Sequence, residues 1–342
     1  MELYLDSADI KEIEEAFELG FLTGLTTTPT FMHREGITDI DAMILKLAEM
    51  VPILQVEALG ETADEICAEA YRLLELGLDK EKTVFKIPVS LVGCAACKRL
   101  RNDGILVNIH LVYTIQQAYM AMQAGASYVC PLVGRLQDQG VNALELVEQC
   151  VDAVNYYGYD CKIMFSSVRN VEHVRNAMQI GVHTITVPWK LMNLLTENYF
   201  TTIGTQQFFE HTKLMTMTVQ DIMSDKNPLI SEDATIMETL MAMTTNGFGA
   251  VMVVDHNGNN IGVFRDGDLR RKLQSEGGKF MDHKMGDLEY NTPISIGSSA
   301  LLIDASDLFK NKKVDTISIV DNGKQVGMLD IQDLLRITAN NG

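Results

Sequence analysis

The sequence predicts an α/β protein in which a (β/α)8 TIM barrel is followed by a smaller α+β module. In residues 1–214, short apolar runs rich in β-forming residues alternate with amphipathic helical patterns, at about 25 residues per unit, and eight such units make a barrel. After residue 214 this alternation stops, and an internal repeat of roughly 60–65 residues begins. We therefore expect two domains, 1–214 and 215–342.

Eight barrel strands are expected in order, at 3–7, 24–28, 53–57, 83–89, 105–109, 128–133, 162–166 and 184–187. Each of them except the last is clearly followed by an amphipathic segment. The last strand leads through Pro188 into a helix near 190–198. A further stretch, 202–213, is expected to pack on the barrel or on a neighbouring subunit.

Composition excludes several classes of protein. The 342 residues are 46% hydrophobic, which is enough to form a full core, and the net charge of −18 offers no basic surface to nucleic acid or an anionic membrane. No apolar run reaches the roughly 18 residues of a membrane span, and the first residues lack the features of a signal peptide. We expect a cytoplasmic protein. Its six cysteines, including Cys94 and Cys97 of one CxxC pair, are expected to be reduced thiols without a metal.

The fourth expected strand, TVFKIPVS at 83–90, contains one lysine among apolar residues. Alternation places Lys86 on the inner face of the barrel, with Val84 and Pro88. Desolvation there disfavours the charged form of an amine, and a neutral amine can attack a carbonyl carbon as a Schiff-base nucleophile. The alternative interpretation is an ion pair between Lys86 and an inward carboxylate, such as Asp6 or Glu57.

The same alternation places polar side chains inward near the carboxyl ends of other strands, where barrel active sites lie. They are Tyr4, Asp6, Thr26, Thr28, Gln55, Glu57, Asn108 and His110. Arg135 follows the sixth strand, and Ser167 and Arg169 follow the seventh, just before a helix that begins near Asn170. Two guanidinium groups and a helix N-terminus suit a phosphate group, although each arginine taken alone is equally typical of a solvated loop.

Five segments resemble the small transaldolase family in its fructose-6-phosphate aldolase-like branch. They are MELYLD at the start, GLTTTP at 24–29, FKIPV at 85–89, AGASYVCP at 124–131 and GRL at 134–136. The resemblance covers about residues 1–210 and implies that Lys86 forms the Schiff base, Asp6 acts in acid/base steps and Gln55 helps to hold the catalytic water. It also implies phosphate binding by Arg135, Ser167 and Arg169, ring-shaped oligomers, and a reaction without metal or other cofactor.

Three positions depart from the family pattern. Thr28 replaces an asparagine that contacts the donor sugar, Leu132 replaces a tyrosine of the aldolase branch, and His110 replaces a threonine that holds the catalytic water. His110, with a reference pKa of about 6.5, either carries protons in place of that water or fills the pocket and selects another substrate. These departures leave open an altered barrel that only binds a sugar phosphate. A third alternative, an aldolase with a two-carbon donor that makes a pentose phosphate, rests on the resemblance of the second domain described next.

The second domain contains two copies of the repeat, at about residues 216–275 and 280–340. In each copy a strand that begins with glycine leads to an aspartate at a helix start, in GVFRDGD at 262–268 and GMLDIQD at 327–333. The arrangement resembles a tandem CBS-domain pair, and FRDGDLRRKL resembles the CBS modules of arabinose-5-phosphate isomerases. The resemblance implies nucleotide binding at Asp268 and Asp333, and Arg265 favours an anionic nucleotide or nucleotide sugar. A helix cap is the alternative for each aspartate.

Taken together, the sequence predicts a metal-independent Schiff-base transaldolase or aldolase that acts on a sugar phosphate and responds to a nucleotide-type ligand. The expected catalytic residues are Lys86, Asp6, Gln55 and His110. The expected substrate-binding residues are Thr26, Thr28, Asn108, Arg135, Ser167 and Arg169. A homo-oligomer is expected, because both resembled families associate.

Overall fold

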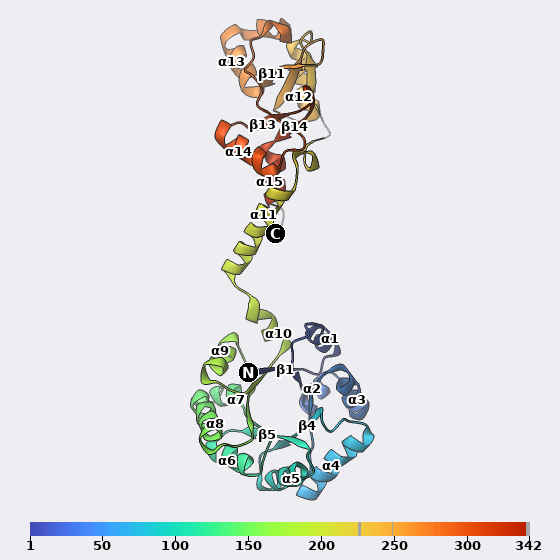
Figure 1. Cartoon of the computed structure of the whole chain (residues 1–342), viewed down its shortest axis with the longest axis vertical. Helices are drawn as coiled ribbons and strands as arrows, with labels where there is room; N and C mark the ends of the chain where they lie inside the picture. Colours follow the sequence, from blue (N-terminus) through green and yellow to red (C-terminus); the bar gives the residue numbers. More distant parts are fainter. Residues whose placement is uncertain (225–226, 248, 340–342) are drawn as a thin grey trace. The chain divides into compact units, whose positions relative to one another are not determined.

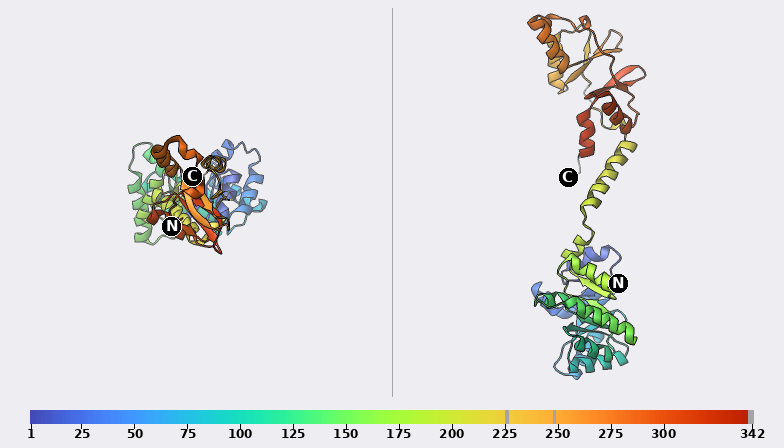
Figure 2. Two further views of the ribbon diagram at one scale, coloured as in Figure 1. Left: turned by 90° about the horizontal axis from the view of Figure 1, so that it is seen from above. Right: turned by 90° about the vertical axis from the view of Figure 1, so that its left-hand side faces the viewer.

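The computed structural model describes residues 1–224, 227–247 and 249–339, and it contains two compact units, Met1–Glu197 and Asn198–Gly342 (Figure 1, Figure 2). The first unit is a closed barrel in which eight parallel strands follow one another in chain order. Figure 1 shows these strands enclosed by helices. The predicted fold class is therefore confirmed for this part of the chain.

All eight barrel strands overlap the segments expected from the sequence. They are β1 (Glu2–Asp6), β2 (Gly24–Thr26), β3 (Leu54–Glu57), β4 (Thr83–Pro88), β5 (Leu106–Val112), β6 (Tyr128–Pro131), β7 (Lys162–Phe165) and β8 (Thr184–Val187). The register places Lys86 between Glu57 on β3 and Asn108 on β5, and it places His110 beside Pro88. Inward side chains of three neighbouring strands are thereby brought together at the carboxyl end of the barrel.

The helices of this unit are α1 (Ile10–Glu18), α2 (Pro29–Arg34), α3 (Ile40–Met50), α4 (Ala63–Leu76), α5 (Leu91–Asn102), α6 (Ile115–Gln123), α7 (Val133–Gln137), α8 (Ala143–Tyr157), α9 (Val171–Ile180), α10 (Trp189–Met192) and the 3-10 helix η1 (Asn193–Thr196). Several begin at a polar cap; Thr62 and Thr114 each form a capping box with the residue three positions later. Phe85 and Ile87 are buried in the layer between strands and helices, as alternation predicts.

Large side chains fill the amino-terminal half of the barrel interior. Tyr4, Val84, Tyr128 and Met164 pack against one another there, and each is almost fully buried. The Tyr4 and Tyr128 hydroxyl oxygens are 3.2 Å apart. Because this layer closes the barrel from below, open space remains only at the carboxyl ends of the strands.

All six cysteines lie in this unit, and all are buried free thiols. Burial raises the pKa of Cys97 to about 12, and Cys94 of the same CxxC pair is also buried, on α5. Such thiols stay protonated and react slowly. Across residues 1–224, 227–247 and 249–339, no helix combines the length and the apolar character that crossing a membrane requires.

The second unit begins with α11 (Tyr199–Thr216) and contains two copies of one sheet motif. Its other elements are η2 (Val219–Asp221), β9 (Leu229–Ser231), α12 (Ile236–Asn246), β10 (Ala250–Val254), β11 (Asn260–Arg265), α13 (Asp266–Glu276), η3 (Gly277–Asp282), η4 (Met285–Asp287), β12 (Ser295–Ile296), α14 (Leu302–Lys312), β13 (Thr316–Asp321), β14 (Lys324–Asp330) and α15 (Ile331–Ala339). In each copy a central strand pairs in parallel with the preceding strand and antiparallel with the following one. The sequence repeat is therefore a repeat of structure.

Helix α11 packs within the second unit, against α14 and α15. Leu214, at its carboxyl-terminal end, joins the apolar cluster around Leu302 and Phe309, and Lys213 Nζ donates a hydrogen bond to the Ile337 carbonyl oxygen at 3.3 Å. The two compact units thus divide between residues 197 and 198, ahead of the boundary expected at 214. The packing of α11 against helices far along the chain, with Lys213 bonded to a residue 124 positions later, determines this division, and no local sequence pattern contains it.

Candidate active site

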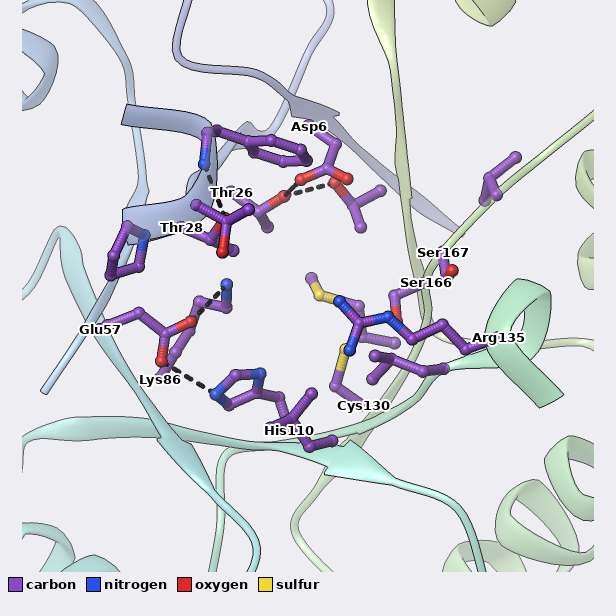
Figure 3. A pocket seen from close by; sticks show the side chains of 18 of the residues that line it. Asp6, Thr26, Thr28, Glu57, Lys86, His110, Cys130, Arg135, Ser166 and Ser167 are labelled. Atoms are coloured by element: carbon purple, nitrogen blue, oxygen red, sulfur yellow. Dashed lines mark hydrogen bonds and ion pairs between the residues drawn. The ribbon is translucent and has the colours of Figure 1, made fainter. Parts of the chain in front are cut away.

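A cavity of about 800 Å³ opens at the carboxyl ends of the barrel strands (Figure 3). Each of the eight strands contributes a lining side chain: Asp6, Thr26, Glu57, Lys86, His110, Cys130, Met164 and Thr186. Loop residues complete the wall, among them Thr28, Arg135, Ser167 and Arg169. The cavity therefore lies where active sites of this fold class are found.

The structure brings most of the sequence-predicted barrel site residues to this cavity. Asp6, Thr26, Thr28, Lys86, His110, Arg135, Ser167 and Arg169 all line it. Gln55 and Asn108 do not; both are fully buried in the barrel interior, and Asn108 Nδ2 donates a hydrogen bond to Gln55 Oε1 at 2.7 Å. They form a polar layer away from the cavity surface.

Lys86 is held inside the cavity wall with 5% of its surface exposed. Its Nζ lies 3.0 Å from Glu57 Oε1 and donates a hydrogen bond to the Thr27 carbonyl oxygen at 2.9 Å. The inward orientation agrees with the alternation argument. The ion pair with Glu57, which the sequence offered as an alternative, is also present.

Glu57 contacts two basic side chains. Besides Lys86, its second carboxylate oxygen lies 2.9 Å from His110 Nε2. Burial by itself raises the pKa of Glu57, but the Lys86 charge and His110 outweigh burial and leave the pKa below its ordinary value. The sequence placed Glu57 on the inner face without naming it as a functional residue.

His110 is buried, with 8% of its surface exposed. Burial lowers the pKa of the imidazole, with the charges of Lys86 and Arg135 acting in the same direction, while Glu57 opposes the shift. The ordinary pKa of histidine is 6.5, and the net shift lowers the pKa of His110 below that value, so the ring is neutral near pH 7.

Asp6 lies at the end of β1 and faces the same cavity (Figure 3). Thr26 Oγ1 donates a hydrogen bond to Asp6 Oδ1 at 2.8 Å and lies 2.6 Å from Thr186 Oγ1. Burial raises the pKa of Asp6, against the opposing effects of Lys86 and Thr26. Asp6 therefore binds a proton more readily than an ordinary aspartate, which suits a group that donates and accepts protons.

Thr28 has a local structural role as well as a place in the wall. It is the N-cap of α2, and its Oγ1 accepts a hydrogen bond from the Phe31 backbone at 3.3 Å. Pro29 follows at the first helical position, where its missing N–H costs nothing. The Thr-Pro pair thus starts the helix and fixes Thr28 beside the cavity.

The cationic side of the cavity combines two loops. Arg135 on α7 donates a hydrogen bond to the Tyr113 hydroxyl at 3.3 Å, and Arg169 after β7 pairs with Asp138 at 3.2 Å. Ser167, between β7 and α9, adopts a left-handed backbone with φ of 58°. The two guanidinium groups and the serine hydroxyl form a surface that fits an anion such as a phosphate.

Several lining residues were not singled out from the sequence, among them Arg34, Cys130 and Ser166. Cys130 and Ser166 lie at the ends of β6 and β7. In a sequence, a single cysteine or serine at such a position gives no functional signal, because it is equally typical of a buried core residue. Burial raises the pKa of the Cys130 thiol to about 11, so it is protonated at neutral pH. Ser166 Oγ donates to the Pro131 carbonyl oxygen at 2.9 Å and joins the two strand ends.

In the second unit, both predicted nucleotide-binding aspartates cap a helix. Asp268 Oδ2 accepts a hydrogen bond from the Arg265 backbone at 3.0 Å, and Asp333 Oδ2 accepts one from Asp330 at 3.1 Å. Asp268 also lines a cavity of about 420 Å³, together with Arg271 and Tyr290. Arg265 and Asp333 do not line this cavity.

Fold and cavity together define a (β/α)8-barrel protein with a buried lysine in a polar pocket, followed by a repeated α+β module. The chain belongs to the Transaldolase/Fructose-6-phosphate aldolase family, which it matches over residues 3–248. Residues 286–340 match the CBS domain and cover the second repeat.

Curated relatives match the barrel. A protein named probable transaldolase from Streptococcus equi subsp. equi is 36% identical over 212 residues, which are 61% of this chain and 97% of the relative. Probable transaldolase 2 of Bacillus anthracis is 33% identical over 215 residues, 61% of this chain and 96% of the relative.

Solved structures match the second unit more weakly. CBSX2, crystallised in complex with AMP, is 26% identical with a TM-score of 0.31 and covers 36% of this chain and 96% of its own. A conserved protein from Pyrococcus horikoshii is 20% identical with a TM-score of 0.34, over 37% of this chain and 96% of its own. Likeness at this level carries no functional argument.

Proposed function

We propose that the barrel is a Schiff-base transaldolase or aldolase for a sugar phosphate, and that a nucleotide-type ligand of the CBS module regulates it. One observation carries the catalytic part of the proposal: a buried lysine amine faces an open cavity whose wall also carries three guanidinium groups, those of Arg34, Arg135 and Arg169. A binding pocket for a phosphate alone has no need of a desolvated amine at its centre.

In this reaction the Lys86 amine attacks the C2 carbonyl of the ketose phosphate and forms a carbinolamine. Loss of water gives an iminium ion, which accepts the electrons of the C3–C4 bond as that bond breaks. The resulting enamine is either protonated and released, which is an aldolase reaction, or attacks an acceptor aldehyde, which is a transaldolase reaction. The names of the curated relatives favour transfer to an acceptor.

Asp6 is the proton donor for carbinolamine dehydration. Its raised pKa keeps a proton available near neutral pH more often than in an exposed aspartate, and the departing hydroxide requires that proton. Gln55 lies below the cavity, so we assign it to the support of Asn108, the neighbour of Lys86 in register, and not to direct contact with water.

Arg135, Ser167 and Arg169 bind the phosphate group, and Thr26 and Thr28 lie near the donor end of the substrate. Holding both ends fixes the scissile bond relative to Lys86, which lowers the entropic cost of reaction. In the CBS module, the cavity beside Asp268 is the proposed nucleotide site. Four exposed aromatic residues of α11, Tyr199, Phe200, Phe208 and Phe209, support the homo-oligomer, because apolar side chains gathered on one exposed element are typical of protein–protein contact surfaces.

Borohydride trapping tests the proposal. The protein is incubated with fructose 6-phosphate, dihydroxyacetone or glycolaldehyde, then reduced, and its intact mass and modified peptide are measured. We expect a donor-derived mass increase on Lys86 that is absent from Lys86→Met. A glycolaldehyde adduct without a dihydroxyacetone adduct would establish the two-carbon donor, and no adduct with any donor would overturn the Schiff-base assignment.

A second candidate function is sugar-phosphate binding without catalysis. The observation that favours it is the contact of 3.0 Å between Lys86 and Glu57, because an amine held in an ion pair is a poor nucleophile. In that case fructose 6-phosphate binds, as calorimetry would show, but borohydride fixes nothing to the protein.

A further inference from the structure

Glu57 bridges the two basic groups of the cavity that lie on neighbouring strands (Figure 3). Oε1 contacts Lys86 Nζ at 3.0 Å, and Oε2 contacts His110 Nε2 at 2.9 Å. All three side chains are at most 10% exposed. Each carboxylate oxygen thus lies beside one basic group, and the contact with His110 is at ion-pair distance without the alignment of a hydrogen bond.

We propose that Glu57 is a positioning residue that makes His110 Nδ1 the proton acceptor for carbon–carbon bond cleavage at Lys86. The inference rests on the proposed Schiff-base function and adds to it a residue outside the predicted set. It assigns the proton of the breaking bond to the histidine, while Asp6 serves the dehydration step.

The contact with Glu57 determines which nitrogen of His110 carries hydrogen. An ionised carboxylate only accepts hydrogen bonds, and a neutral imidazole has one N–H and one lone pair. A lone pair on Nε2 would lie 2.9 Å from the negative Oε2 of Glu57, which is unfavourable, so we infer that Nε2 carries the hydrogen and that Nδ1 keeps its lone pair. Figure 3 shows the second ring nitrogen of His110 on the side of the open cavity, where a substrate hydroxyl can reach it.

The charges around His110 support a neutral resting ring. Glu57 on β3 faces it with a negative charge, while Lys86 on β4 and Arg135 on α7 face it with positive charges. One buried carboxylate cannot balance two adjacent cations, so His110 stays neutral beside the positive iminium that forms at Lys86. The neutral form is the one that accepts a proton.

Cleavage of the C3–C4 bond then leaves the total charge of the three groups unchanged. The proton of the C4 hydroxyl moves to Nδ1 of His110, and the O–H electrons form the carbonyl of the departing aldehyde. The C3–C4 electrons form the C2–C3 double bond, and the iminium π electrons become the lone pair on Lys86 nitrogen. Positive charge disappears from Lys86 as it appears on His110, and Glu57 retains one cationic partner throughout.

The return step uses the same proton. In transfer, the enamine attacks the acceptor aldehyde, the iminium reforms, and the imidazolium gives its proton to the new alkoxide. In hydrolytic release, the imidazolium protonates C3 instead. In both routes His110 ends neutral, ready for the next cycle.

The test compares Glu57→Gln, Glu57→Asp, His110→Gln and the double variant Glu57→Gln/His110→Gln. General-base contributions are typically 10²- to 10⁴-fold, so we expect His110→Gln to lower the cleavage rate by about 100-fold while borohydride trapping at Lys86 persists. Glu57→Gln should lose a similar factor, because a side-chain amide can donate to Nε2 and reverse the tautomer. Glu57→Asp should recover part of the rate.

Two readouts separate positioning from a merely structural ion pair. The double variant should be no slower than the slower single variant, because both substitutions abolish the same function, proton acceptance by His110 Nδ1. Nitrogen-15 NMR of labelled histidine, assigned with His110→Gln, should show hydrogen on Nε2 in the unaltered protein and a changed tautomer in Glu57→Gln. If the rate loss of the double variant equals the product of the two single losses, or if the tautomer is unchanged in Glu57→Gln, the proposed role of Glu57 is wrong.

Failure of the proposed function is a different result. If the unaltered protein gives no Lys86 adduct, the Schiff base itself is wrong and the role in cleavage falls with it. If the adduct forms and only the tautomer and rates are insensitive to Glu57, the inference alone is wrong. Melting temperatures of all variants show whether a rate loss reflects unfolding.

Discussion

Gly134 lies so close to Ser167 that a Cβ atom added to the glycine would be 2.1 Å from the Ser167 carbonyl oxygen. The same Cβ would be 2.8 Å from Arg169 Cγ. Only glycine allows α7 to approach the loop after β7 this closely. The approach places Arg135 and Arg169, from different loops, on one side of the cavity.

Gly134→Ala should therefore weaken phosphate binding. The added methyl group forces α7 away from the loop after β7, which separates Arg135 from Ser167, and overpacking of this kind costs about 1–3 kcal/mol of stability. We expect KM for fructose 6-phosphate to rise while trapping of unphosphorylated dihydroxyacetone is unchanged. Gly204→Ala on α11, where no atom lies within 4 Å of the new methyl, is the matched control. An equal loss with both donors would contradict the explanation.

Lys86→Met should destabilise the barrel near neutral pH. The substitution leaves the Glu57 carboxylate buried without its cation, and breaking a buried pair in this way costs about 3–5 kcal/mol. Lys86→Met/Glu57→Gln should regain much of that loss, because the unpaired charge is gone. Urea unfolding at pH 7 measures both. A double variant as unstable as Lys86→Met would show that packing, and not charge, stabilises this site.

Stability should fall as the pH drops through 6.5. Burial lowers the pKa of His110, His173 and His183 below the ordinary value of 6.5. Between that value and the folded pKa values, the unfolded chain therefore binds more protons than the folded chain. Their stabilising contribution is complete above 6.5 and is lost as pH falls toward the folded pKa values. Each such histidine changes the slope by at most about 1.4 kcal/mol per pH unit. Urea unfolding from pH 8 to 5 should show a smaller slope for His110→Gln.

Asp268→Ala should abolish nucleotide binding by the CBS module, whereas Asp333→Ala should not. Both aspartates cap a helix through the same backbone contact, so each substitution should cost about 1 kcal/mol of stability. Only Asp268 lines the cavity of about 420 Å³. Calorimetric titration with AMP, ATP and a nucleotide sugar measures the difference. Equal losses of binding would mean that the cap, and not the cavity, governs the site.

The barrel was predictable because two independent periods agree in this sequence. A unit repeat of strand and helix sets the topology, and alternation within each strand sets which side chains face inward. Lys86 could be placed in the barrel interior because its apolar neighbours Phe85 and Ile87 belong on the face that packs against the helices. Alternation along the strand then turns Lys86 to the opposite, inner face. The position of α11 was not predictable, since its partners α14 and α15 follow much later in the chain.

The sequence predicts most of the residues that line the site, but it predicts less well how these residues contact one another. Alternation shows that Glu57 and Gln55 face inward, but not that Glu57 reaches the cavity while Gln55 stays beneath it. That difference depends on the stagger between strands, which only the register of the closed barrel fixes. The bridge from Glu57 to His110 spans β3 and β5, and no local pattern contains such a relationship.

The Tyr4 and Tyr128 layer has a kinetic consequence for a transfer reaction. Because these rings and Met164 close the barrel from below, every reactant enters and leaves by one mouth. In the proposed transfer reaction, the aldehyde released from the first sugar phosphate would lie on the Arg135 side and would block the acceptor until it departs. Initial-rate plots against the two substrates should therefore be parallel lines, the signature of a double-displacement sequence imposed by a dead-end channel.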